Sequence, residues 1–113
     1  MPHYLHQVAY SNESWGSLIS HPQNRMEVVA KAIEKLGGRV VAGYFAFGQY
    51  DVMVITEMPD NVSAAGLSIA FAGGGACKAV NTIPLLTTEE AIQALKRASE
   101  SGYRPVGAES KAA

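Results

Sequence analysis

Two runs of strand-forming residues, 39–47 and 51–57, lie on either side of Gly48-Gln49. β-Branched and aromatic residues favour strands, and a glycine at the first central position favours a two-residue type II′ turn. The pattern therefore predicts an antiparallel hairpin in which Phe45 faces Val52. No other local signal restricts the fold as strongly, because a hairpin sets both the direction and the register of its strands.

Both faces of this hairpin carry apolar residues. On the face that we expect helices to cover, the turn pairs Phe47 with Tyr50, Phe45 with Val52, and Gly43 with Val54. Alternation along the strands places a second set on the other face, namely Val40, Ala42, Tyr44, Ala46, Asp51, Met53, Ile55 and Glu57. A face in water should alternate apolar with polar residues, and the middle of this one is apolar. We therefore expect a second copy of the chain to cover it, in a dimer whose two sheets form a barrel.

The rest of the chain completes a β-α-β-β-α-β order with a further helix at the end. Apolar spacing, caps and breakers predict a strand over 4–10, helices over 14–20 and 22–36, a helix that Asp60 caps and that runs to about 72, a strand over 76–83, and a helix that begins at Thr87 or Thr88 and runs to about 99. This order is typical of an α+β, ferredoxin-like fold with a four-stranded antiparallel sheet and its helices on one face. We expect one domain over 1–102 and an extended or disordered tail over 103–113.

Composition excludes several classes of protein. The 113 residues are 48% hydrophobic with a net charge of −1, which favours a single globular domain and gives no basic surface for nucleic acid. Cys77 is the only cysteine, so we expect neither a zinc framework nor a disulfide, and a cytoplasmic location. The start shows no signal-peptide pattern, and no apolar run reaches the ~18 residues of a membrane span. We expect no metal, no cofactor and no membrane contact.

Several short motifs occur in the order seen in a known family. They are Leu36-Gly37-Gly38, Tyr44, Phe47-Gly48-Gln49-Tyr50-Asp51 and Glu57-Met58-Pro59-Asp60. With these motifs the chain resembles the GYD domain family, which is named for the Gly-x-Tyr-Asp motif seen here at Gly48, Tyr50 and Asp51. The resemblance runs from Tyr4 to about Ala91. It implies a small bacterial-type protein of dimeric α+β-barrel character, with Gly48, Tyr50, Asp51, Pro59 and Asp60 as its structural motif. The family has no established general activity and supplies no catalytic residue.

Acid–base chemistry has three candidates, Asp51, His6 and Tyr44. Asp51 begins a strand on the face away from the helices, and Tyr44 lies diagonally from it on the neighbouring strand. His3 and His6 have opposite parity on the first strand, so one of them reaches the same face. Such a set could exchange protons near neutral pH. In the alternative interpretation, Asp51 accepts structural hydrogen bonds at the hairpin and the histidine lies at a strand end.

Ligand binding has a separate set of candidates, Arg25, Tyr50 and Met53. Arg25 lies at the entrance of the second predicted helix, where family members tend to carry an arginine, and could bind an anionic substrate at the mouth of a pocket. An exposed arginine on a helix is the alternative. Met53 lies on the face that we expect to be covered, and Tyr50 is either a ligand contact or a cross-strand partner of Phe47.

Three functions remain open. The favoured hypothesis is a small homo-oligomeric barrel, a dimer or an assembly of dimers, that binds a small molecule between the sheet and its partner subunit. The first alternative is a cofactor-independent monooxygenase or isomerase of a small aromatic or enolic substrate, as in related barrels. The second is a regulatory or interaction module that uses the oligomer surface and the tail after Gly102.

Overall fold

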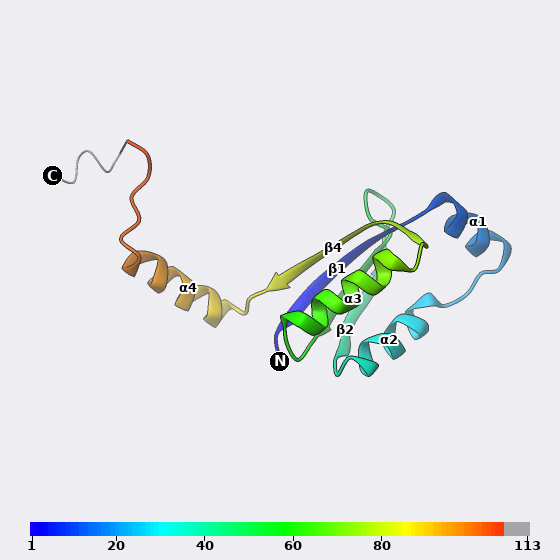
Figure 1. The fold of residues 1–113 in the computed structure, drawn as a ribbon, viewed down its shortest axis with the longest axis horizontal. Helices are drawn as coiled ribbons and strands as arrows, with labels where there is room; N and C mark the ends of the chain where they lie inside the picture. The colour runs from blue at the N-terminus through cyan, green and yellow to red at the C-terminus, as the bar shows by residue number, and fades with distance from the viewer. Residues whose placement is uncertain (108–113) are drawn as a thin grey trace.

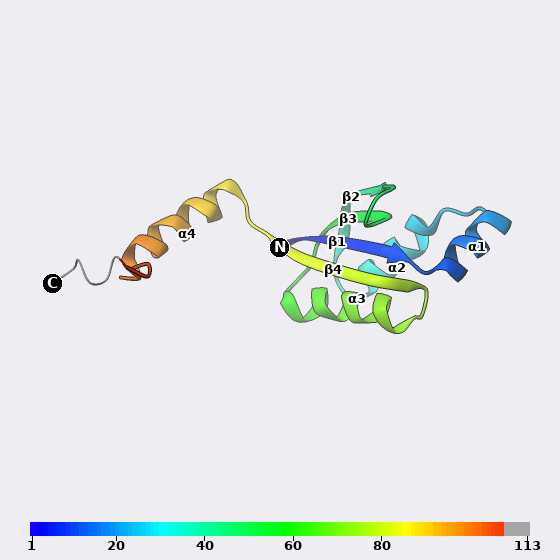
Figure 2. The same ribbon diagram turned by 90° about the horizontal axis from the view of Figure 1, so that it is seen from above.

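A four-stranded antiparallel sheet with the strand order β2-β3-β1-β4 organises the computed structural model, which describes residues 1–107. Its elements (Figure 1) are β1 (His3–Tyr10), α1 (Asn12–Ser20), α2 (Arg25–Lys35), β2 (Arg39–Phe45), β3 (Val52–Glu57), α3 (Asn61–Gly73), β4 (Cys77–Leu85) and α4 (Thr88–Glu100). Helices α2 and α3 lie on one side of the sheet, as Figure 2 shows. The predicted α+β, ferredoxin-like arrangement is confirmed. The predicted tail has no helix or strand over 103–107, and its residues 108–113 lie outside the described part.

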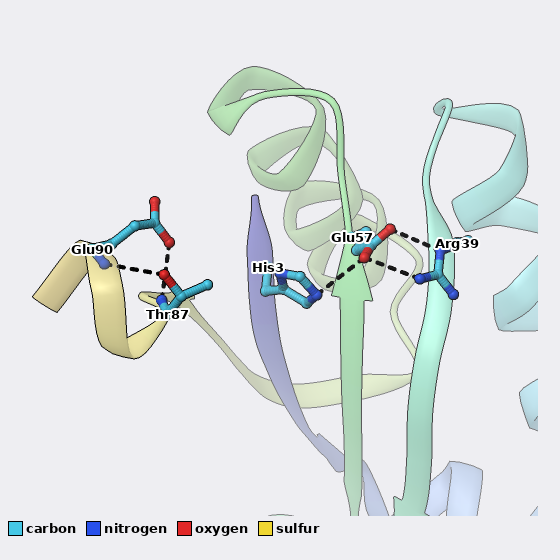
Figure 3. A network of polar contacts seen from close by, with 5 residues as sticks. All are labelled: His3, Arg39, Glu57, Thr87 and Glu90. Carbon is cyan, nitrogen blue, oxygen red and sulfur yellow. Dashed lines mark hydrogen bonds and ion pairs between the residues drawn. The ribbon is translucent and has the colours of Figure 1, made fainter. Parts of the chain in front are cut away.

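Side-chain caps set where the helices begin. Asp60 caps α3 as predicted, because its Oδ1 accepts a hydrogen bond of 2.7 Å from the Ser63 amide. At α4, the Thr87 hydroxyl accepts from the Glu90 amide at 3.1 Å while the Glu90 carboxylate accepts from the Thr87 amide at 2.9 Å (Figure 3). Such a capping box satisfies amides that have no partner within the helix. The second helix begins later than predicted, at Arg25, because the Asn24 side chain caps it.

The core lies between the sheet and helices α2 and α3. Alternate residues of the two central strands point into it, and from β1 these are Tyr4, His6, Val8 and Tyr10. Strand β3 adds Val52, Val54 and Thr56, and the helices add Ile33, Ala64 and Leu67, all of them buried. Burial of each large apolar side chain contributes about 1.5–3 kcal/mol. Along β3 this alternation places the residues in between, Met53, Ile55 and Glu57, on the opposite face of the sheet.

The β2–β3 hairpin has the predicted register but a different turn. Phe45 pairs with Val52 and Gly43 with Val54, as predicted. The strands stop there, and a hydrogen bond of 2.8 Å from the Ala46 amide to the Asp51 carbonyl closes a loop that holds Phe47 and Tyr50. A type II′ turn needs a positive φ at Gly48, whereas the described residues with positive φ are other glycines. The predicted two-residue turn and its Phe47–Tyr50 pair are therefore wrong.

A β-bulge in β2 corrects a second prediction. The register shifts by one residue at Val41, so Val40 pairs with Thr56 while Ala42 pairs with Ile55. Val40 therefore packs against the helix-covered core and not on the face of Ala42, where alternation alone had placed it. One extra residue in a strand turns all residues beyond it to the opposite face.

Helix α4 stands apart from the rest of the molecule. It follows β4 and extends away from the sheet (Figures 1 and 2), giving the molecule extents of 67 × 29 × 22 Å. None of its residues is buried. Within the described residues, no helix has the length and apolar character that crossing a membrane requires.

Candidate functional site

A pocket of about 320 Å³ lies between the sheet and helices α2 and α3. Its apolar lining comes mainly from β1, β3, α2 and α3 and includes Val8, Val52, Val54, Val28, Val29, Ala32, Leu67, Ala70, Phe71 and Ala76. Pockets for small molecules measure about 300–1,000 Å³ and are lined mainly by apolar side chains. The size and lining of this pocket therefore suit a small apolar molecule.

Polar side chains reach this pocket from three lining residues, Tyr10, Arg25 and Cys77. Tyr10 and Cys77 are cross-strand partners on β1 and β4, and Arg25 begins α2. Burial raises the pKa of the Tyr10 hydroxyl and of the Cys77 thiol, and the nearby Arg25 charge acts in the opposite direction on both pKa values. All three groups therefore lie close together, with one positive charge among them.

A second, smaller pocket of about 180 Å³ adjoins the first. The two share Tyr10, Arg25 and Ala76, and the smaller one adds the polar side chains of Ser14, Ser17 and Gln23. Helix α1 is held beside it because the Ser14 hydroxyl donates a hydrogen bond of 2.8 Å to the Ala76 carbonyl. Arg25 thus lies where an apolar pocket meets a polar one.

Arg25 has no acidic partner in residues 1–107, where the ion pairs are those of Glu57 with His3 and with Arg39. Its guanidinium forms a long hydrogen bond of 3.3 Å from Nη1 to the Gln23 amide oxygen and interacts with the Tyr10 hydroxyl. A guanidinium without an acidic partner can form charge-assisted hydrogen bonds with an anion, and such bonds are roughly twice as strong as neutral ones. The predicted ligand-binding residue Arg25 therefore lies at the pocket.

The structure places His6 in the core. Its ring is fully buried, with Nε2 2.9 Å from the Thr56 hydroxyl and Nδ1 3.0 Å from the Thr82 hydroxyl, and it packs edge-on against Phe71 of α3. Burial lowers the pKa of His6 to about 4. The imidazole is consequently neutral at neutral pH and holds three strands together.

The structure does not bring His6, Asp51 and Tyr44 together in one chain. Tyr44 pairs with Met53 on the face away from the helices and is 68% exposed, whereas His6 points to the helix side. The Asp51 carboxylate accepts a hydrogen bond of 2.9 Å from the Tyr10 amide, and the Asp51 amide donates one of 2.8 Å to the Val8 carbonyl. Asp51 therefore holds both β1 residues that line the pocket, Val8 and Tyr10, and its catalytic role stays a prediction.

The other candidates are distributed along the sheet. His3 lies 3.2 Å from the Glu57 carboxylate, which also accepts two hydrogen bonds from Arg39, at 2.7 and 3.0 Å (Figure 3). This cluster is at the opposite end of β3 from Asp51. The hydrogen bonds from Arg39 lower the pKa of Glu57. Met53 accepts a weak hydrogen bond from Gln7 on the face away from the helices, and Tyr50 lies half-buried in the hairpin loop.

The apolar pocket itself was missed at the level of the sequence. The one sequence signal for it is the small size of several α3 residues, since a helix of small side chains can lie close to a sheet. Ala32, Ala70 and Ala76 line the pocket, and short side chains leave space unfilled where a larger one would close it.

Within residues 1–107, no three His, Cys, Asp or Glu side chains are close enough to hold a metal ion.

Comparison with known proteins agrees with the motifs of the hairpin region. No curated protein matches the sequence significantly. The family model of the GYD domain matches residues 4–95, which include β2, β3 and β4, all of β1 except His3, and most of α4. The chain therefore belongs to the GYD domain family.

Proposed function

We propose that this protein binds a small, largely apolar molecule in the pocket between its sheet and helices α2 and α3. The pocket of about 320 Å³ and its lining are the observation that supports this function. Protein interiors are normally packed as densely as organic crystals, and atoms that line an unfilled space lose dispersion contacts. A bound molecule restores these contacts, so binding is favourable without any rearrangement of the strands.

The proposed site is on the other face of the sheet from the one that the sequence favoured. The sequence placed the ligand between the sheet and a partner subunit, on the face of Tyr44 and Met53. The pocket lies on the helix side, where Val8, Val52 and Val54 form its base. Ligand binding in this form needs no partner subunit.

Filling the pocket with a larger side chain should weaken ligand binding. We expect the neutral fluorescent probe N-phenyl-1-naphthylamine to bind the wild-type protein, and Ala70→Phe to weaken its binding by about tenfold or more, because the ring occupies the space of the probe. The matched control is Ala72→Phe, since Ala72 is on the same helix but does not line the pocket. Fluorescence titration measures both. Equal binding by the two variants, or none by the wild type, would contradict the proposal.

A second candidate function, self-association, has its own support. The face of the sheet away from the helices carries half-exposed Leu5, Met53 and Ile55 in its middle, with Ile83 beside them. Helix α4 has 13 residues and no buried side chain, and helices of this length are marginal in water unless an apolar face is packed. We propose that a second copy of the chain covers this sheet face and supports α4, which gives a homo-oligomer.

A charge in the middle of this face should separate the subunits. We expect wild-type protein to behave as a dimer or larger assembly, and Ile55→Glu to behave as a monomer, because a carboxylate buried without a partner costs several kcal/mol. Val62→Glu is the control, since Val62 is 81% exposed on α3 and away from this face. Light scattering coupled to size exclusion gives the masses. A monomeric wild-type protein would rule out self-association through this face.

A further inference from the structure

We infer that the ligand of the pocket is an amphipathic monocarboxylate, with its apolar body between the sheet and the helices and its carboxylate on the Arg25 guanidinium. This inference rests on the proposed function, since it concerns the same pocket. It adds the chemical class of the ligand, which the apolar lining alone leaves open.

The position of Arg25 between the two pockets is the first support. On one side is the apolar pocket of about 320 Å³, and on the other is the pocket of about 180 Å³ that contains Ser14, Ser17 and Gln23. A molecule that spans both pockets has one end among apolar side chains and the other end among hydrogen-bonding groups. The site therefore matches a molecule with one apolar and one polar end.

The charge of the site is the second support. Arg25 is half-buried, and residues 1–107 provide no carboxylate within ion-pair distance of it. The Asp51 carboxylate, whose charge also acts on the Tyr10 hydroxyl, accepts a hydrogen bond from the Tyr10 amide. A bound carboxylate supplies the missing negative charge and fits the planar guanidinium through two parallel hydrogen bonds.

Neighbouring groups favour a carboxylate over a more highly charged anion. Arg25 is the one cationic residue that lines either pocket. The remaining polar groups are the neutral side chains of Tyr10, Cys77, Ser14, Ser17 and Gln23. One positive charge balances one carboxylate, whereas a phosphate dianion would keep an uncompensated charge next to an apolar wall.

The test compares two probes that differ in the end group, octanoate and octanol, by calorimetric titration and by displacement of N-phenyl-1-naphthylamine. We expect wild-type protein to bind octanoate about tenfold more tightly than octanol. Arg25→Gln should remove this preference by weakening octanoate binding about tenfold, while Arg25→Lys should retain part of it. Arg39→Gln is the matched control, because Arg39 pairs with Glu57 away from the pocket.

The outcomes separate this inference from the proposed function. If octanol and octanoate bind equally well to the wild type, the carboxylate preference is wrong while the pocket still binds apolar molecules. If neither probe binds and the naphthylamine also fails, the proposed function itself is wrong. The wild-type comparison needs no variant, so the inference is tested even if Arg25→Gln does not fold. An equal preference for octanoate in wild type and a folded Arg25→Gln would overturn the role of Arg25.

Discussion

Acidification from pH 6.5 to about 4 is expected to lower the free energy of unfolding by about 3 kcal/mol through His6 alone. Burial lowers the pKa of His6 from 6.5 to about 4 in the folded protein. Below pH 6.5 the unfolded chain binds a proton that the folded protein does not bind, so protons favour unfolding. The loss grows until the pH reaches the folded pKa and then levels off, and each pKa unit corresponds to about 1.4 kcal/mol.

Urea unfolding at a series of pH values, followed by Trp15 fluorescence, measures this effect. His6→Gln removes the titrating ring, so its unfolding free energy should depend much less on pH between about 6.5 and 4.5. In this pH range the effect of His6 is separate from that of three carboxyl groups, Glu57, Asp60 and Glu90. Hydrogen bonds lower the pKa values of these groups, so their contribution to stability is lost only at lower pH.

The exposed His21 provides the matched control. His21→Gln should retain the wild-type dependence on pH. Equal slopes for wild type and His6→Gln would show that His6 does not cause the acid sensitivity, whatever the absolute stability of the variant.

Replacement of Gly38 by alanine is the second change for which we expect a large effect, a loss on the order of 3 kcal/mol or a failure to fold. A Cβ at Gly38 would lie 2.6 Å from the Glu57 carbonyl oxygen and even closer to the Met58 sulfur. Met58 is fully buried and Glu57 is the last residue of β3. Relief of the overlap would therefore displace the backbone of a central strand.

Two other glycines provide graded controls. A Cβ at Gly48 meets nothing within 4 Å, and Gly48 does not have a positive φ, so Gly48→Ala should change stability by less than about 0.5 kcal/mol. A Cβ at Gly43 would overlap the side chain of Met26. Because that side chain is flexible, Gly43→Ala should lower the free energy of unfolding by an intermediate amount. Denaturant unfolding of the three variants gives the order. A larger loss for Gly48→Ala than for Gly38→Ala would contradict this account of the packing.

Gly48, the glycine of the Gly-x-Tyr-Asp motif, is thus not the glycine on which the packing depends most; Gly38 is. The sequence indicated a special turn at Gly48, because Gly-Gln between two strands commonly forms one. In the structure the special contact is at Gly38, where the chain leaves α2 and passes beside the end of β3. Close approach of two backbones depends on tertiary packing and leaves no periodic pattern.

Local chemistry explains which parts of the fold could be predicted. Asp60 and Thr87 start helices through hydrogen bonds to residues three positions further along the chain. Phe45 faces Val52 because the facing residues are close in sequence. Gly37 follows the C-cap of α2 with a φ of 84°, a backbone conformation that residues with a side chain rarely adopt. Each of these features depends on groups a few residues apart, so the sequence alone contains the necessary information.

The location of the candidate site depended on contacts between distant segments. Tyr10, Arg25 and Cys77 surround one end of the pocket although no motif links them. The sequence predicted that either His3 or His6 shares a face of the sheet with Tyr44. The pairing of β1 with β3 places His6 and Tyr44 on opposite faces.

By itself, the sequence determined the order of the elements, the caps of α3 and α4 and the pairing of Phe45 with Val52 in the hairpin, because these features follow from neighbouring residues and from the period of the apolar pattern. Only the tertiary structure decided that Val40 turns inward at the bulge, that His6 is buried between two threonines, and that Arg25 faces a pocket. The physical reason is that burial and unfilled space are properties of packed elements. A small side chain such as Ala70 leaves space only where the opposite wall does not fill it.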